Sequence, residues 1–202
     1  MRYISRCVVA ILLVLFVTAG VCAQQMLPET ISDRGVQLIM KLEGFAAKPH
    51  WDVNGYAVGY GSHTWNGRKV TRKYPRVVTP ESAAQQLFRE LAVCENVVRQ
   101  SVSTDLSQDA YDALVSVVYN LGRVNTSILT RMESGEDVTV NDFLTTATVR
   151  GRTDWRLHAR RLREFLLFTG DYDSALMSFK SRQDVRNTLS LVRSLSTGEM
   201  RP

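Results

Sequence analysis

The chain has 202 residues, of which 45% are apolar and 22% are charged. This length and composition are typical of one folded domain and exclude a predominantly disordered chain. The formal net charge is +5, a modest excess that suits contact with an anionic polymer and equally suits a soluble protein without such a partner.

The first 23 residues have the pattern of an export signal. Arg2 and Arg6 precede an uncharged segment, residues 7–23, that is rich in Val, Ile and Leu and ends in Val-Cys-Ala. This order predicts a signal peptide that is cleaved after residue 23, with membrane contact only through the leader. The alternative is an uncleaved membrane anchor, because 17 uncharged residues reach the lower limit of a spanning helix. Both alternatives predict a periplasmic or extracellular protein.

Cleavage of this leader would remove Cys7 and Cys22 and leave Cys94 as the only thiol. No intramolecular disulfide is then possible. Cys94 falls on the apolar face of an expected helix, and we interpret it as a buried, unreactive side chain rather than a nucleophile.

The sequence offers no cofactor, metal or nucleic-acid signature. The three histidines, His50, His63 and His158, lack the spacing of metal ligands. Five cations lie within nine residues, a pattern typical of a solvated loop or, beside a cleft, of a surface that attracts an anionic polymer. These cations are Arg68, Lys69, Arg72, Lys73 and Arg76. No nucleic-acid-binding module accompanies them, and we expect no nucleic-acid partner.

The first expected element is a helix over Thr30–Lys41. Ser32 is suited to the N-cap, and Gly44 is a natural C-terminal stop. Residues that share one helical face follow the spacing i, i+3, i+4 and i+7, namely Val36, Ile39, Met40 and Glu43. Glu43 therefore lies on the inward face, at the end of an apolar helix.

A glycine-rich segment follows this helix. Residues 51–70 contain four glycines among aromatic and β-branched side chains, which predicts short strands joined by tight turns.

The remaining sequence is predicted to be helical. Thr79 and Pro80 begin a long amphipathic helix that extends to about Gln100. Further helices are expected over 107–122, 126–133, 140–146, 154–168 and, as one helix or two, 173–197. The pattern predicts an α+β domain over residues 24–172, with a small antiparallel strand region near its start, a mostly helical lobe, and a cleft between the two. Residues 173–202 are predicted to form a C-terminal helical extension.

Glu43 and Asp52 place two carboxyl groups at the end of a helix and in a nearby turn. Cleavage of a glycosidic bond needs one carboxyl group that protonates the leaving oxygen and a second that activates water or stabilises positive charge. Partial desolvation at the helix end favours a protonated Glu43, whereas water and backbone N–H groups in the turn favour an ionised Asp52.

Four sequence blocks occur in the order found in phage-type lysozymes. They are Leu-Glu-Gly-Phe at 42–45, Trp-Asp-Val-Asn-Gly-Tyr-Ala-Val-Gly-Tyr-Gly-Ser-His-Thr at 51–64, Tyr-Asn-Leu-Gly at 119–122 and Arg-Arg-Leu-Arg-Glu at 160–164. From Ser32 to Tyr172 the chain resembles the phage lysozyme family of glycoside hydrolases, muramidases that include many endolysins.

The resemblance implies a lysozyme-like fold and a role for each matched residue. Glu43 matches the family's general acid, and Asp52 matches the aspartate that orients the attacking water. The implied reaction is inverting hydrolysis of the β-1,4 bond between N-acetylmuramic acid and N-acetylglucosamine in bacterial peptidoglycan, by a monomer without a cofactor. Tyr60, Ser62 and Asn120 are expected to contact the substrate, although Asn120 also suits a helix cap.

The sequence departs from the family pattern at the residue that helps to hold the water. Ala57 stands where the family has a threonine. Ser62 or Thr64 could supply a hydroxyl group, and His63 could act as a base or as an ordinary surface residue. Arg160 falls where the family often directs an arginine at the catalytic glutamate, so it is expected either to position Glu43 or to be exposed.

Two other functions remain open. A lytic transglycosylase needs the glutamate but no aspartate for water. A wall-binding protein that has lost catalysis would also explain the missing threonine.

Overall fold

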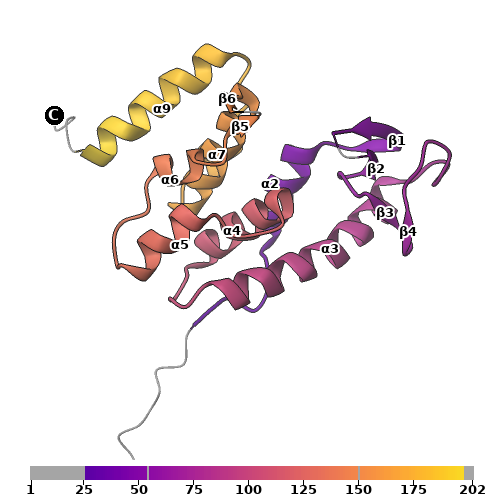
Figure 1. Cartoon of the computed structure of the whole chain (residues 1–202), viewed down its shortest axis with the longest axis horizontal. Helices are drawn as coiled ribbons and strands as arrows, with labels where there is room; N and C mark the ends of the chain where they lie inside the picture. The colour runs from indigo at the N-terminus through magenta and orange to yellow at the C-terminus, as the bar shows by residue number, and fades with distance from the viewer. Residues whose placement is uncertain (1–25, 54, 150, 198–202) are drawn as a thin grey trace, which may run out of the picture.

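The computed structural model describes residues 26–53, 55–149 and 151–197 (Figure 1). The predicted signal or anchor therefore lies outside the described residues. Within the described ranges, no helix combines the length and hydropathy needed to cross a bilayer. The fold is α+β, as expected: a small region of antiparallel strand pairs is followed by a mostly helical lobe.

Helix α2 (Asp33–Glu43) carries Glu43 as its last residue. Ser32 caps it by accepting a hydrogen bond from the Gly35 amide, and Gly44, at φ 70°, ends it. A positive φ is a conformation that glycine adopts without strain. The buried side chains of Val36, Leu38 and Ile39 attach the helix to the core, so the position of Glu43 is fixed by packing.

The strand region begins with an antiparallel hairpin of β1 (Ala46–Asp52) and β2 (Gly55–Gly59), which pairs His50 with Ala57 and Asp52 with Gly55. The sequence predicts strands only from Trp51 onward. Strand β1 begins earlier, at Ala46. Pro49 cannot donate to a ladder, and the pairing is irregular between Ala46 and His50.

A second short hairpin, β3 (Thr64–Trp65) and β4 (Arg68–Lys69), completes this region. The strand region has its own small core of Val58, Trp65, Val70, Val78 and Ala83. A Cβ at Gly59 would lie 3.0 Å from the Ala83 Cβ, so the hairpin approaches the next helix as closely as a glycine allows.

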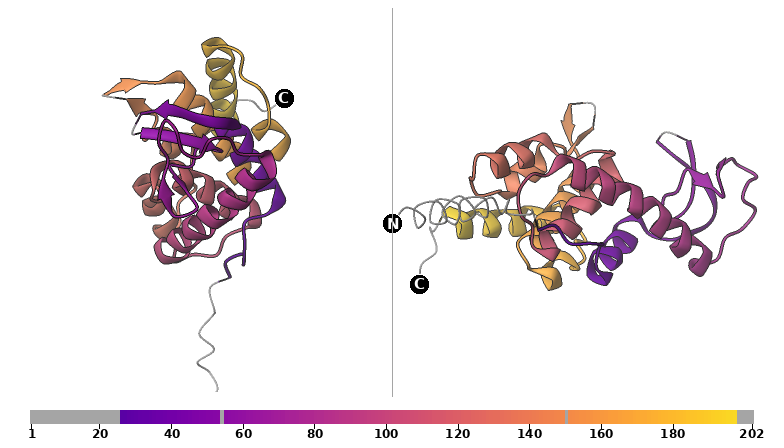
Figure 2. Two further views of the ribbon diagram at one scale, coloured as in Figure 1. Left: turned by 90° about the vertical axis from the view of Figure 1, so that its right-hand side faces the viewer. Right: turned by 90° about the horizontal axis from the view of Figure 1, so that it is seen from below.

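Helix α3 (Pro80–Ser101) runs from the strand region into the helical lobe (Figures 1 and 2). Thr79 and Ser82 form a capping box at its start, and Pro80 occupies the first turn, where no donor is lost. These signals confirm the predicted helix.

Helix α4 (Gln108–Leu121) forms the centre of the helical lobe, and its residues 110–118 are all buried. It packs against α2, α3 and α7 (Trp155–Phe168). The smaller helices α5 (Thr126–Glu133) and α6 (Val140–Leu144) also lie in the predicted segments.

The C-terminal part differs in detail from the prediction. Helix α6 ends at Leu144 rather than Thr146, and a hairpin of β5 (Thr148–Val149) and β6 (Arg152–Thr153) precedes α7. Two-residue strands have no periodicity that a sequence can display.

Two helices follow α7, α8 (Tyr172–Ala175) and α9 (Arg182–Thr197). Val185, Leu189 and Val192 of α9 are buried in the same core as α4 and α7. The strand region and α9 lie at opposite ends of the molecule (Figures 1 and 2).

Candidate active site

A pocket of about 560 Å³ lies between the strand region and the helical lobe, and Glu43 and Asp52 both line it. Ser62 and Asn120, expected to contact a substrate, line it as well. Tyr60 is not among its described lining residues. The Tyr60 ring instead packs on Phe45, with ring centroids 5.7 Å apart.

The Glu43 side chain is largely enclosed, with 18% of its surface exposed. Its Oε1 accepts a hydrogen bond from Arg160 Nη1 at 2.7 Å. A Cβ at Gly61 would lie 3.1 Å from Glu43 Oε2, so the backbone beside this carboxyl group has no room for a side chain. Gly61 also has a φ of 90°, which other residues rarely adopt.

Arg160 belongs to a buried chain of polar groups behind Glu43. Its Nε donates to Glu164 Oε1 at 3.0 Å, and Ser116 Oγ donates to the same oxygen at 2.9 Å. Arg161 donates to Glu164 Oε2 and to Asn120 Oδ1. The network therefore links the helix that carries Glu43 to the last turn of α4.

The burial of Arg160, which is 8% exposed, decides between the two expectations for this residue. Simple surface exposure is wrong, because the side chain is buried and contacts Glu43. Burial alone would lower the pKa of Arg160, but the charges of Glu164 and Glu43 outweigh it and raise that pKa.

Asn120 does not cap its helix, contrary to one of the two interpretations of this residue. Gly122, in the left-handed conformation, is the C-cap of α4 and donates its amide to Val118 O at 2.7 Å. The exposed Asn120 side chain is instead held by Arg161 at the pocket wall.

Asp52 ends strand β1 in a more solvated setting, with 49% of its side chain exposed. Its Oδ1 accepts a hydrogen bond from the Val53 amide at 2.7 Å.

His63 Nε2 lies 3.6 Å from Asp52 Oδ2, and His63 Nδ1 lies 3.1 Å from the Tyr56 carbonyl oxygen. A carbonyl can only accept, so the proton of a neutral ring belongs on Nδ1. Nε2 then faces Asp52 without a proton, and an ion pair forms only with the protonated ring.

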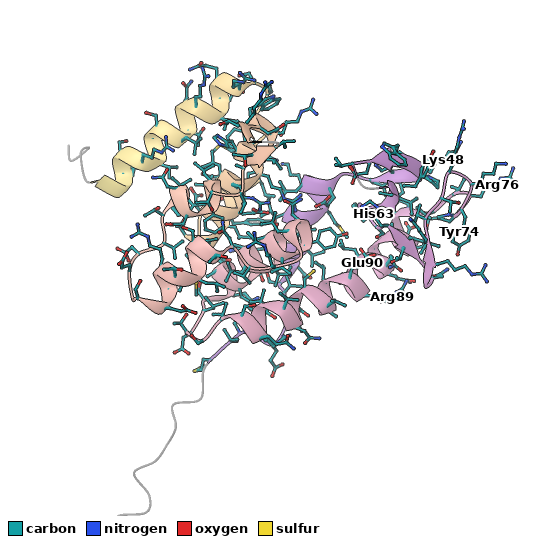
Figure 3. The ribbon with its side chains drawn as sticks, viewed as in Figure 1. Lys48, His63, Tyr74, Arg76, Arg89 and Glu90 are labelled. Carbon is teal, nitrogen blue, oxygen red and sulfur yellow. The ribbon has the colours of Figure 1, made fainter. Side chains whose placement is uncertain are left out.

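Glu90 contributes a third carboxyl group to the pocket. Its Oε2 accepts hydrogen bonds from Ser62 Oγ at 2.8 Å and from Tyr119 Oη at 3.0 Å, and its Oε1 accepts one from Gln86 at 2.9 Å. Figure 3 shows Glu90 and His63 on the side of the strand region that faces the helical lobe. The Ser62 hydroxyl is thus already committed as a donor to Glu90.

Sequence reasoning missed Glu90 and Tyr119 as pocket residues. Glu90 lies on a long amphipathic helix, where an acidic residue between apolar positions looks like any solvated side chain. Burial, followed by the charges of Glu90 and Glu43, raises the pKa of Tyr119, so its hydroxyl is a fixed donor at neutral pH.

Ala57 lines a smaller hollow of about 240 Å³ together with Glu43 and Asp52. The Ala57 side chain is only 1% exposed, and its strand pairs it with His50. Ala57, which is expected to stand in place of the family threonine, therefore lines the same hollow as both acidic residues and has only a methyl side chain.

Cys94 lines the main pocket and is half-buried rather than fully buried. Burial, followed by the charges of Glu90 and Glu95, raises the pKa of Cys94 to about 11. The neutral thiol is a poor nucleophile and a poor metal ligand. In the part of the chain that the structure describes, no three His, Cys, Asp or Glu side chains cluster as a metal site would require.

The five cations of residues 68–76 are all exposed. None is among the described residues that line the pocket. Figure 3 shows Arg76 at the outer end of the strand region, together with Lys48. Arg68 and Lys69 form strand β4, and the other three cations lie in the segment that follows it.

Comparison with known proteins identifies the family. The phage lysozyme family model matches residues 40–164, more than half of the chain. The endolysin of Bacillus phage B103 is 32% identical over 151 residues, which cover 70% of this chain and 55% of that protein. The endolysin of Acyrthosiphon pisum secondary endosymbiont phage 1 is 32% identical over 93 residues, which cover 46% of this chain and 60% of that protein. The chain thus spans less than two thirds of the length of these relatives.

Solved structures that share the fold include an endolysin and a muramidase domain. The endolysin of Escherichia coli O157:H7 phage FAHEc1 superposes with a TM-score of 0.61 at 27% identity, covering 69% of this chain and 92% of that one. The muramidase domain of SpmX from Asticaccaulis excentricus has a TM-score of 0.58 at 29% identity. The match covers 70% of this chain and 98% of that domain. The fold is that of a lysozyme-like protein. The chain belongs to the phage lysozyme family.

Proposed function

We propose that this protein is a muramidase that hydrolyses the β-1,4 bond between N-acetylmuramic acid and N-acetylglucosamine in bacterial peptidoglycan. One observation carries the proposal: two carboxyl groups line one pocket in different surroundings. Glu43 is mostly enclosed and Asp52 is half-exposed. This difference in setting allows one carboxyl group to act as an acid and the other as a base.

In the proposed reaction, Glu43 donates a proton to the glycosidic oxygen as the bond to the anomeric carbon breaks. Asp52 accepts a proton from a water molecule that attacks this carbon from the opposite face, which inverts its configuration. Inversion predicts a separation of roughly 6.5–9.5 Å between the two carboxyl groups, enough to admit the water.

Arg160 has a positioning role in this proposal. Its contact with Glu43 Oε1 holds this carboxyl group in place. Glu164 binds the same guanidinium, so Arg160 keeps a partner when it moves away from Glu43. Sugar binding is expected to loosen the contact between Arg160 and Glu43 and to leave the carboxyl group of Glu43 to the glycosidic oxygen.

Family membership supports this proposal, and the names of the relatives agree with it, since they include endolysins and a muramidase domain. We further propose that residues 1–23 export the chain, so that it meets peptidoglycan outside the cytoplasm. Ser62 and Asn120, both at the pocket wall, and Tyr60, beside Phe45, are the proposed substrate contacts.

Loss of turbidity in suspensions of purified cell wall tests the activity, and analysis of the released ends tests the mechanism. A reducing end is the expected product. An anhydro-muramic end would instead indicate a lytic transglycosylase, the second candidate. A transglycosylase needs no group that holds water, and Ala57, in the same hollow as Asp52, offers only a methyl group there. Binding to the wall without any clearing would contradict both enzymatic proposals.

A further inference from the structure

A second cavity, of about 590 Å³, lies between α9 and the start of α7, away from the active site. It shares no described lining residue with the pocket that holds Glu43. Helix α9 lies at the end of the molecule opposite the strand region (Figures 1 and 2). A ligand in this cavity would therefore leave the active site free.

The cavity is strongly basic. Arg182, Arg186 and Arg193 of α9 line it together with His158 of α7. None of its described lining residues is acidic. Within the ranges that the structure describes, no acidic side chain forms an ion pair with Arg182 or Arg186, and both are exposed. Arg193 is anchored by Asn141 Oδ1, at 2.8 Å from Nη2.

The positive charge at this cavity also acts on His158. Burial, followed by the charge of Arg193, lowers the pKa of His158, and the charge of Asp154 only partly opposes this. An anion in the cavity would act in the opposite direction and favour the protonated ring.

The floor of the cavity is apolar. Trp155, Val185 and Leu189 line it between the cations, and the volume is within the range of roughly 300–1,000 Å³ typical of small-molecule sites. A bare inorganic anion would fill only a small part of such a space. An aromatic and aliphatic floor suits the apolar face of a sugar ring.

We propose that this cavity binds a phosphate-bearing sugar, with the phosphate held by Arg182 and Arg186 and the sugar ring lying on Trp155. Guanidinium groups match phosphate oxygens in pairs. A phosphate ester offers three acceptor oxygens and a charge of about −1.5 to −2 at neutral pH, which suits a cavity lined by several guanidinium groups better than a single carboxylate does. This proposal does not depend on the proposed activity.

The test is calorimetric titration of the full-length protein at low ionic strength with three probes: N-acetylglucosamine 1-phosphate, N-acetylglucosamine and inorganic phosphate. The sugar phosphate is expected to bind at least about tenfold more tightly than inorganic phosphate, and the neutral sugar is expected not to bind. Loss of charge-assisted hydrogen bonds in an R182Q/R186Q double variant should weaken binding by about tenfold or more. Arg34→Gln makes the same kind of change at one exposed site on α2 and should leave binding unchanged.

Two further readouts locate the ligand. The titration of the His158 ring, followed by NMR, should move to higher pH in the presence of the sugar phosphate in the parent and not in the double variant. Trp155→Leu should weaken the binding of the sugar phosphate and leave that of inorganic phosphate unchanged.

The proposal is overturned if the parent does not bind the sugar phosphate at about 10 mM, or if the folded double variant binds as the parent does. Equal affinities for inorganic phosphate and the sugar phosphate would overturn the assignment of a sugar. Thermal unfolding of each variant verifies that it is folded, and the exposed positions of Arg182 and Arg186 make a folded variant the expected result.

Discussion

Arg160 donates one hydrogen bond to Glu43 Oε1 at 2.7 Å and another to Glu164 Oε1 at 3.0 Å. One buried cation therefore holds two carboxyl groups, one facing the pocket and one inside the core. Because Glu164 is also held by Ser116 and Arg161, Arg160 keeps a partner when Glu43 leaves it. The buried guanidinium of Arg160 therefore has a hydrogen-bond partner in the core that does not depend on Glu43.

Glu43→Gln should reduce wall clearing by at least ~100-fold, because it removes the proton donor while it keeps the volume of the side chain and an oxygen that Arg160 can bond. Turbidity loss of wall suspensions measures this effect. Glu133→Gln, the same change at an exposed site at the end of α5, is the control and should clear wall as the parent does. Near-normal clearing by a folded Glu43→Gln protein would exclude Glu43 as the acid.

Glu164→Gln should lower the free energy of unfolding by about 3–5 kcal/mol, because it removes the buried carboxylate that Arg160 and Arg161 share. Denaturant unfolding measures this change. Glu136→Gln is the matched control: its ion pair with Arg131 is exposed and should contribute at most about 1 kcal/mol. Similar effects for the two variants would show that the buried network does not stabilise the fold.

The sequence predicted the elements that carry their own local signals. Ser32 and Thr79 are capping residues, and Gly44 and Gly122 stop helices, so α3 and α4 lie where they were expected. Helix α2 begins at Asp33 and ends at Glu43, rather than at Thr30 and Lys41. The first part of β1, before Trp51, was missed because Pro49 cannot donate to a ladder and the pairing there is irregular. The β5–β6 hairpin was missed because each strand has only two residues.

For the candidate site, the sequence identified Glu43, Asp52 and Arg160, but not the carboxyl groups of Glu90 and Glu164. Glu90 and Glu164 each lie on a helix, and the hydrophobic periodicity of a helix predicts only which of its faces is apolar. Their contacts with Ser62 and Ser116 join residues 28 and 48 positions apart. Such pairs depend on how helices pack, which periodicity alone does not specify.

His158 makes stability depend on pH in a defined direction. Its pKa in the folded protein is lowered from 6.5, chiefly by burial, so below pH 6.5 the unfolded chain binds more protons than the folded one. Stability is then lost as the pH falls from 6.5 through the lower folded pKa. His158→Gln should reduce this loss.

The pH dependence of stability that His158 causes is small. At most one proton is involved, which corresponds to less than about 1.4 kcal/mol per pH unit, and solvent screens the half-buried ring. Denaturant unfolding at pH 7.5 and at pH 5 gives the change in unfolding free energy with pH for the parent and for the variant. The difference between these two changes isolates His158, because the other titrating groups contribute equally to both proteins. A variant that loses more stability on acidification than the parent would contradict the prediction.

Ala57→Thr should raise the rate of wall hydrolysis, because it places a hydroxyl group in the hollow that Glu43 and Asp52 line, where it can hold the attacking water. One hydrogen bond contributes about 0.5–1.5 kcal/mol, or up to roughly tenfold in rate. Ala57→Val adds the same volume without the hydroxyl and should not raise the rate. Ser62→Ala tests whether Ser62 holds the water instead, although its hydroxyl already donates to Glu90. If neither Ala57→Thr nor Ser62→Ala changes turnover while Asp52→Asn inactivates the protein, then Asp52 alone orients the water and the missing threonine has no effect on catalysis.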